Sequence, residues 1–348
     1  MRIQFRLLLV STLALVSAVP AGAAEELHAR IESGATAVEQ KVIDWRRDIH
    51  AHPELGNRET RTAALVAKHL QSLGIEVTTG VAHTGVVGVL RGGKPGRVVA
   101  LRADMDALPV TEPEGLSFAS RVRTTYNDQE TGVMHACGHD AHVAMLMGAA
   151  EVLAGMRDEL PGTVKFIFQP AEESAPQGEE GGAELMVKEG VLDGDVKPEA
   201  IFGLHVWPRD AGNLYVRPEG MMAASDRIYI TVHGRQTHGS QPWRGVDPIT
   251  VAGQIILALQ TIASRQVDIT KAPVVITIGS IHGGIRYNII PDDVTLAGTL
   301  RTFDVDMQHD IWSRIKTTAE HVAMSAGATA DVVIEPHAPV VINDPALL

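Results

Sequence analysis

The spacing of hydrophobic residues along the first part of the chain alternates between two rhythms. Three stretches have helical spacing: 37–49, 59–73 and 141–153. Gly74 directly follows the second stretch, where a helix end favours a left-handed residue. Four short apolar runs are typical of strands buried beneath helices: 86–90, 98–101, 164–168 and 200–206. The pattern therefore predicts an α/β domain with a helix-covered sheet.

The order of elements changes after Pro218. Six further segments have strand or helix spacing, in the order βαββαβ: 227–233, 248–263, 274–280, 294–302, 306–326 and 330–335. This order is typical of the split ferredoxin-like arrangement. We therefore expect a second domain over 219–335, with the first domain made of 24–218 and 336–348.

The N-terminal residues have a pattern of their own. Arg2 and Arg6 precede an apolar run over 7–19 and then the small residues of 21–23, which is the pattern of a cleavable signal peptide. The run is short for a permanent membrane anchor, although an uncleaved anchor is the alternative. We expect residues 1–23 to be removed and the protein to be exported, to the periplasm or out of the cell.

Composition and charge narrow the possible partners. The chain has 348 residues, 45% hydrophobic and 21% charged, as in an ordinary globular protein. Its formal net charge of -12 becomes -14 without Arg2 and Arg6, which argues against nucleic acid as a partner. No membrane partner is expected after signal cleavage. Cys137 is the only cysteine, so it forms no intramolecular disulfide, and its neighbours must explain it.

Two motifs in the first domain carry metal-binding and acid-base chemistry. The run HACGHD at 135–140 opens the predicted helix 141–153 and places a thiolate and an imidazole two residues apart, within reach of one ion. The run QPAEE at 169–173 follows a predicted strand, and its paired carboxylates fit one metal ligand beside one general base. The structural alternatives are a buried small cysteine and a solvated acidic loop.

Two further motifs place polar groups at the ends of other predicted strands. His205 lies near the end of the run 200–206, and Asp104 and Asp106 follow the run 98–101. Side chains arriving from several strand ends are what a metal site in an α/β domain requires. As alternatives, His205 fits a satisfied core histidine, and the two aspartates fit helix or turn caps.

In this order the motifs resemble the amidohydrolase branch of the aminoacylase and carboxypeptidase superfamily, which includes hippurate and auxin-conjugate hydrolases. The resemblance runs from about Trp45 to the chain end. Further runs contribute to it: HPELG at 52–56, THGSQP at 237–242, YNIIP at 287–291 and GTLR at 298–301. It implies a catalytic domain with a mixed sheet, interrupted by a smaller ferredoxin-like domain that acts as a lid and forms a homodimer.

The resemblance also implies roles for individual residues. Two divalent metal ions per subunit, zinc or manganese, are expected. Their ligands would be Cys137, His139, Glu173 and His205. Glu172 would be the general base, Asp106 would support the metal site, and His238 would help to hold the oxyanion. Asn288 and Arg301 would hold a substrate carboxylate, which the guanidinium fork fits.

The implied function is hydrolysis of the amide bond of N-acyl amino acids, such as hippurate or N-acetyl amino acids, by water activated at the metals. A metallo-dipeptidase or carboxypeptidase is the alternative among enzymes. Family members usually continue beyond the position of Leu348 and supply a last histidine ligand, for which His337 is a poor substitute. A shortened, inactive chain that keeps the fold as a non-catalytic module is therefore the second alternative.

Overall fold

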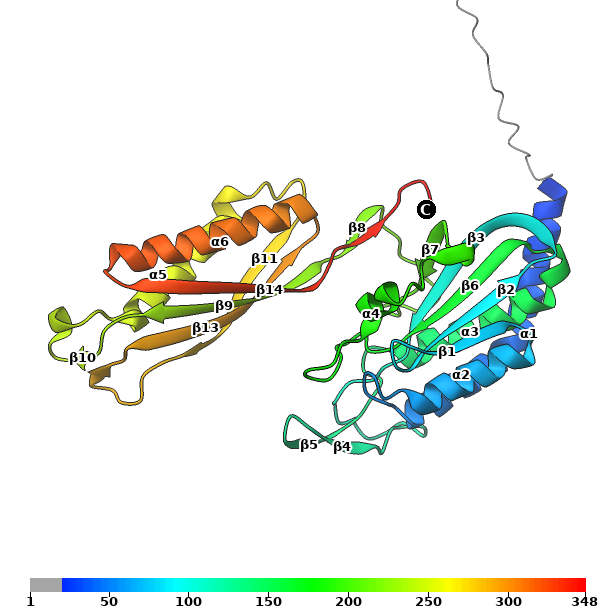
Figure 1. Cartoon of the computed structure of the whole chain (residues 1–348), viewed down its shortest axis with the longest axis horizontal. Helices are drawn as coiled ribbons and strands as arrows, with labels where there is room; N and C mark the ends of the chain where they lie inside the picture. The colour runs from blue at the N-terminus through cyan, green and yellow to red at the C-terminus, as the bar shows by residue number, and fades with distance from the viewer. Residues whose placement is uncertain (1–20) are drawn as a thin grey trace, which may run out of the picture. The chain divides into compact units, whose positions relative to one another are not determined.

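The computed structural model describes residues 21–348, with side chains from Glu25 onward. The predicted signal peptide falls almost wholly outside these residues. The chain divides into two compact units, the first ending at Arg209 and the second running from Asp210 to Leu348. The boundary predicted from the sequence lies at 218/219. The last strand, β15 (Val341–Asn343), pairs with β8 (Glu219–Met222) within the second unit (Figure 1).

The first unit is built on a mixed five-stranded sheet with the order β1-β2-β6-β3-β7. β1, β2 and β6 pair antiparallel, whereas β6, β3 and β7 run parallel. The predicted mixed sheet is therefore confirmed. The strands are β1 (Glu76–Val81), β2 (Gly85–Arg91), β3 (Lys94–Asp104), β6 (Pro161–Gln169) and β7 (Ala200–Gly203).

Helices cover both faces of this sheet. Three of them pack on one face, where Leu70, Met147 and Phe166 are fully buried in a common core. The fourth packs Met186 against Ile167 on the other face. Phe166 and Ile167 are neighbours in β6 but pack on opposite faces of the sheet, because side chains alternate along a strand. The helices are α1 (Ala21–Ala51), α2 (Thr60–Ser72), α3 (His139–Gly155) and α4 (Gly182–Lys188).

The second unit contains a four-stranded antiparallel sheet with the order β11-β13-β9-β14. Its two helices pack on the sheet around a core in which Ile228, Ile255 and Ile311 are fully buried. Each helix begins with an aspartate, Asp247 or Asp304, whose carboxylate accepts hydrogen bonds from amides of the first turn. In chain order the elements are β9 (Ala224–His233), α5 (Pro248–Thr261), β11 (Val274–His282), β13 (Asp293–Thr302), α6 (Val305–Ser325) and β14 (Thr329–Ala338).

Short elements complete the two units. The first unit has a hairpin of two strands, and the second has a two-residue ladder near one end of its sheet (Figure 1). These strands are β4 (Arg123–Tyr126), β5 (Gln129–Gly132), β10 (Thr237–His238) and β12 (Ile289–Ile290). Single helical turns lie at Arg157–Glu159, Gly194–Val196, Pro242–Arg244 and Ile262–Gln266.

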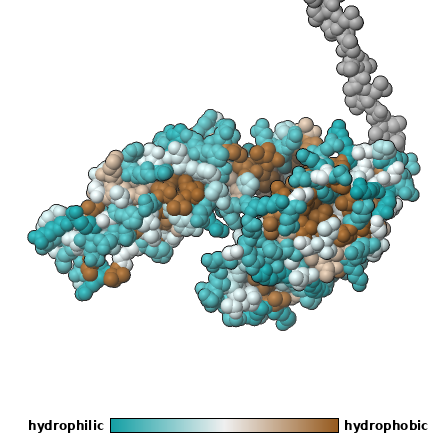
Figure 2. All heavy atoms as spheres, viewed as in Figure 1, coloured by the Kyte–Doolittle hydropathy of each residue, from teal (hydrophilic) through white to brown (hydrophobic). Residues whose placement is uncertain are grey.

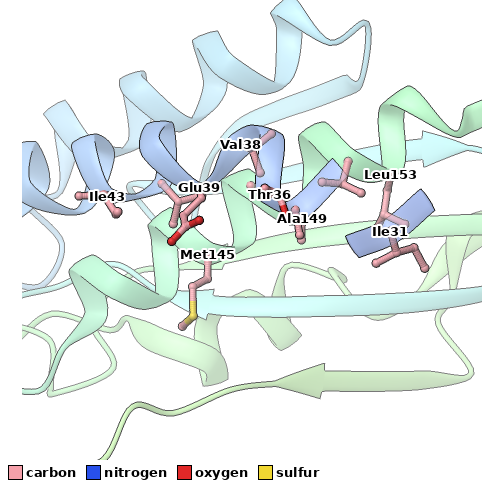
Figure 3. A pocket seen from close by; sticks show the side chains of 12 residues that line it. Ile31, Thr36, Val38, Glu39, Ile43, Met145, Ala149 and Leu153 are labelled. Carbon is pink, nitrogen blue, oxygen red and sulfur yellow. The ribbon is translucent and has the colours of Figure 1, made fainter. Parts of the chain in front are cut away.

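The first unit also presents apolar surface. A groove of about 640 Å³ lies between α1 and α3, and Figure 3 shows Val38 and Ile43 of α1 and Ala149 of α3 among the residues that line it. None of the predicted site residues lines it. Exposed apolar residues also occur at β7, where Phe202 is 41% exposed, and Figure 2 shows hydrophobic surface over the sheet of this unit. The helices described include none with the length and apolar character needed to cross a bilayer.

Candidate metal centre

The candidate ligands lie just past the carboxyl ends of three neighbouring strands. β3, β6 and β7 run parallel, so these ends meet at one edge of the sheet. α3 begins beside them. The residues that follow the three strand ends are Asp106, then Glu172 with Glu173, then His205, and the start of α3 contributes Cys137 and His139.

His139 is shared by three groups of metal-ligating side chains. In each group, one ligand atom per residue lies within 4.8 Å of the others. The three groups are Cys137–His139–His205, His139–Glu172–Glu173 and Asp104–His139–His142. The structure therefore brings together the four predicted ligands and the predicted base in the first unit.

The His139 ring is oriented by a backbone hydrogen bond. Its side chain is fully buried, and Nδ1 donates to the carbonyl oxygen of Asp106 at 2.8 Å. Nε2 then faces Glu172 Oε2 at 3.8 Å and Glu173 Oε1 at 4.0 Å, and it has no hydrogen-bond partner among the described residues. A buried nitrogen without a partner is costly, so this atom fits a role as ligand to a cation.

The negative surroundings of His139 also suit a cation. Burial alone lowers the pKa of this imidazole, but hydrogen bonding to Asp106, the nearby thiol of Cys137 and the charge of Asp104 raise it to about 11. A raised pKa means that a proton and a divalent cation compete for the same nitrogen, so metal affinity here should fall as the pH is lowered.

Cys137 and His205 face each other across the site. His205 Nδ1 donates to the carbonyl of Val206 at 2.6 Å, which turns Nε2 toward Cys137 Sγ at 3.4 Å. Zinc bonds of about 2.3 Å to sulfur and about 2.0 Å to nitrogen at a tetrahedral angle would put these atoms about 3.5 Å apart. The observed spacing fits that geometry. Burial lowers the pKa of His205, which favours the neutral ring that a metal needs.

Hydrogen bonds from its backbone amides hold the loop that contains Glu172 and Glu173 in place. Three successive amides donate to buried carboxylates: Ala171 to Glu59 at 2.8 Å, and Glu172 and Glu173 to the two oxygens of Asp106 at 3.0 and 2.9 Å. Ala171 adopts a φ of 47°, a left-handed conformation that such strong anchoring can maintain. Asp106 thus supports the site by fixing the backbone beneath both glutamates.

Glu172 has the electrostatic setting of a base. Partial burial, and then the nearby charge of Asp104, raise the pKa of its carboxyl group. The pKa of Cys137 is also raised: the nearby His139 ring favours the thiolate, but burial and Glu173 outweigh this effect. Both shifts describe the site without its cation, which would favour the thiolate.

No role in the site was predicted from the sequence for His142 or for Asp104, which are hydrogen-bonded to each other there. They are 3% and 1% exposed, and their side chains lie 2.6 Å apart. Burial would raise the pKa of Asp104, but hydrogen bonding to His142 and the Arg102 guanidinium hold it well below its usual range. A signal was available, because His142 follows His139 by three residues and so shares its face of α3.

In the second unit, the β10–β12 ladder brings His238 close to Asn288. The amide of Gly239 donates to the carbonyl of Asn288 at 2.8 Å. His238 Nδ1 accepts hydrogen bonds from the Ser240 amide at 3.1 Å and the Ser240 hydroxyl at 2.8 Å. Its Nε2 must therefore carry the ring proton and can act as a donor.

Arg301 lies in β13 of the four-stranded sheet, at the end away from the connection to the β10–β12 ladder. It pairs in register with Ser225 at the start of β9, whereas Asp293 pairs with His233 at the end from which the chain continues to β10 (Figure 1). At about 3.3 Å per strand residue, Arg301 is about 26 Å from Asp293. Within one chain, the structure therefore does not bring Arg301 and Asn288 together. His337 lies inside β14, which extends beyond the predicted strand.

The sequence also matches a known family over most of its length. Residues 100–348 match the profile of peptidase family M20/M25/M40. The chain belongs to this family. The family predicted from the motifs is thereby confirmed, and the M20 protein is a metal-dependent hydrolase acting on amide bonds.

Individual relatives of this M20 protein carry related descriptions. It is 41% identical over 323 residues to thermostable carboxypeptidase 2 of Saccharolobus solfataricus, covering 92% of this chain and 78% of that one. It is 40% identical over 293 residues to an N-acyl-L-amino acid amidohydrolase of Geobacillus stearothermophilus, covering 84% and 75%. A crystal structure of a dinuclear metal-binding M20 peptidase from Bacillus subtilis superposes with a TM-score of 0.75 at 37% identity, covering 90% and 78%.

Proposed function

We propose that this M20 protein removes the acyl group from N-acyl amino acids, with hippurate and N-acetyl amino acids as substrates. The observation that carries the proposal is the position of Glu172, a carboxylate with a raised pKa beside Nε2 of His139, which has no hydrogen-bond partner in the described part of the chain. The amidohydrolase relative at 40% identity supports the choice of substrate class.

The residues fit two divalent cations, zinc or manganese. Cys137, His139 and His205 offer the sulfur and nitrogen donors that zinc prefers, and Glu173 adds an oxygen donor that manganese also accepts. When bound, the ions supply Lewis acidity that polarises the amide carbonyl and acidifies water. The dinuclear relative supports the number of ions.

Glu172 carries the proton during the reaction. Its raised pKa suits a group that accepts a proton from the attacking water and then returns it to the leaving amine. The anchoring of its backbone amide on Asp106 keeps the carboxylate beside His139 through both transfers.

We further propose that the active protein is a homodimer in which the second unit is a ferredoxin-like lid. His238 Nε2 carries a proton that it could donate to an oxyanion, and the Asn288 carbonyl accepts from the amide of Gly239, the residue after His238. Arg301 is too far along the sheet to contact the same small substrate from the same chain. If His238, Asn288 and Arg301 all contact one substrate molecule, they must therefore come from two different chains. The N-terminal signal pattern supports an exported, periplasmic or secreted enzyme.

A substrate panel tests the reaction. The purified chain, loaded with zinc or manganese, is assayed on hippurate, N-acetyl amino acids and dipeptides with a free amino terminus. We expect the N-acyl amino acids to be hydrolysed faster than the free dipeptides, and we expect chelation of the metal to abolish turnover. The Glu172→Gln protein is the inactive control. Preference for free dipeptides would support the carboxypeptidase or dipeptidase alternative, in line with the carboxypeptidase relative.

A further inference from the structure

The segment that carries His205 lies beyond the regular sheet. The ladder between β3 and β7 ends at Gly203, and the residues that follow it are exposed, Leu204 to 57% and Val206 to 37%. His205 is nevertheless 3.4 Å from Cys137. Its position must therefore depend on specific contacts made by this segment outside the sheet.

Val206 makes two such contacts with the start of α3. Its amide donates to Nε2 of His142 at 2.9 Å. Its side chain packs against Gly138, where an added Cβ atom would collide with it. Gly138 has a φ of 88° and separates Cys137 from His139. Both contacts tie the residue after His205 to the helix start that carries the other ligands.

The hydrogen bonds define the state of the His142 ring. Nε2 accepts the Val206 amide and so carries no proton, which leaves the proton on Nδ1. Nδ1 donates it to Asp104 at 2.6 Å, and Asp104 accepts a second hydrogen bond from Arg102, also at 2.6 Å. A buried carboxylate held by a guanidinium thus selects the tautomer that can accept from Val206.

His142 also lies in a group that could hold a metal, with Asp104 and His139. Its ring nitrogens are both engaged, however, one by Val206 and one by Asp104. A ligand needs a free lone pair, so the hydrogen bonds favour a supporting role over direct coordination. The ring also packs edge-on against His205, with centroids 4.8 Å apart.

We propose that His142 is a positioning residue that holds His205 at the metal centre through the amide of Val206, with Asp104 fixing the His142 tautomer. This inference rests on the metal-dependent function proposed above. It assigns a role to a buried pair that the catalytic steps do not use. Its consequence is that the affinity for metal depends on a side chain that does not touch the ion.

Cobalt binding tests the proposal without relying on turnover. The metal-free full chain is titrated with Co²⁺, whose absorption reports both thiolate ligation and ligand geometry, and chelator competition measures affinity. We expect His142→Leu to bind Co²⁺ about 10- to 100-fold more weakly, with an altered spectrum, as for other residues that orient a ligand. His142→Gln should recover most of the affinity and the wild-type spectrum, because its amide can accept from Val206 and donate to Asp104.

A matched control removes another histidine of the same unit. Nε2 of His69 donates a hydrogen bond to the carbonyl oxygen of Met147 at 3.1 Å. Met147 is not one of the candidate metal ligands. His69→Leu should leave the cobalt spectrum and affinity unchanged. If His142→Leu fails to fold, His142→Asn replaces it, since that shorter amide can reach Asp104 but not Val206.

The outcomes separate the possible roles. An unchanged spectrum and affinity in a folded His142→Leu or His142→Asn protein would overturn the positioning role. A His142→Gln protein as weak as His142→Leu would also overturn it, because the ring nitrogen itself would then be the ligand. Failure of the wild-type chain to bind Co²⁺ at all would instead refute the proposed metal-dependent function, and this inference with it.

Discussion

Glu172 and Glu173 are neighbours in one loop and face the same histidine nitrogen at nearly equal distances, 3.8 and 4.0 Å. Distance alone therefore does not separate a base from a ligand. The two roles differ in what a neutral amide can replace: an amide cannot accept the proton that a base must carry, and it is a weaker metal ligand than a carboxylate. Changing each glutamate singly to glutamine can therefore test whether Glu172 is the base and Glu173 the ligand.

We predict that Glu172→Gln keeps its metal but loses turnover by about 10²- to 10⁴-fold, the usual contribution of a general base. Glu173→Gln should instead lose metal, and its turnover should partly return at high metal concentration. Elemental analysis and steady-state rates on the same samples check both. Near-normal turnover in metal-replete Glu172→Gln would contradict the assignment, as would loss of metal from Glu172→Gln alone.

The site residues differ in how visible they are in the sequence. Cys137 and His139 are visible because their spacing in HACGHD is local and chemically unusual. His142 is less visible because its role depends on the amide of Val206, 64 residues away. Glu59 is invisible for the same reason, since its partner is the Ala171 amide. Long-range hydrogen bonds between side chain and backbone leave no periodic trace.

At the scale of elements, α1 and α3 are joined by a buried charge network. His50 of α1 is 4% exposed, and its two ring nitrogens lie 3.0 Å from Asp140 of α3 and 2.9 Å from Glu112. The hydrogen bond to Asp140 is the main cause that raises the pKa of His50 above 6.5, against the effect of burial. The charged ring therefore links the helix that opens the unit to the helix that carries the ligands.

This network predicts a pH dependence of stability. Because the folded pKa of His50 is above its unfolded value, its stabilisation is complete below pH 6.5 and is lost as pH rises through the raised folded pKa. On going upward from pH 6.5, the Tm of the metal-free wild type should fall more steeply than that of His50→Gln. Thermal unfolding of both proteins across this range is the measurement, and parallel curves would count against the network.

The elements themselves were largely predictable where one face is buried. The spacing over 141–153 and 164–168 lies within α3 and β6, because apolar residues there pack on a core. β1 was not predicted, since its side chains are mostly exposed and form no alternating pattern. The β4–β5 hairpin is similarly exposed. Exposed strands are held by backbone hydrogen bonds, which do not depend on apolar spacing.

At the scale of the whole molecule, the proposed dimer makes a quantitative prediction. If His238 acts on the partner's substrate, a mixed dimer of His238→Ala and Glu172→Gln chains contains one site with both groups intact. Purified mixed dimers should then show about half of the wild-type activity, because a twofold dimer has two equivalent sites. Two different affinity tags isolate the mixed species for assay.

The matched control for this experiment is each parent homodimer, which should be inactive or nearly so. If His238 instead served its own chain, every subunit of the mixed dimer would carry one defect. Mixed dimers as inactive as their parents would therefore exclude action across the interface.

The three anchored amides of residues 171–173 have a consequence for hydrogen exchange. They lie outside helices and strands, yet each donates to a carboxylate, Glu59 or Asp106, that is at most 1% exposed. Exchange with solvent then requires a local opening, so these amides should exchange slowly, whereas Gln177 and Gly178, exposed in the same loop, should exchange fast. Deuterium uptake of the metal-stripped chain checks this. If the loop keeps its conformation without the ions, it does not have to reorder when they bind. The metal-stripped enzyme should then regain activity at a rate limited by the binding of metal.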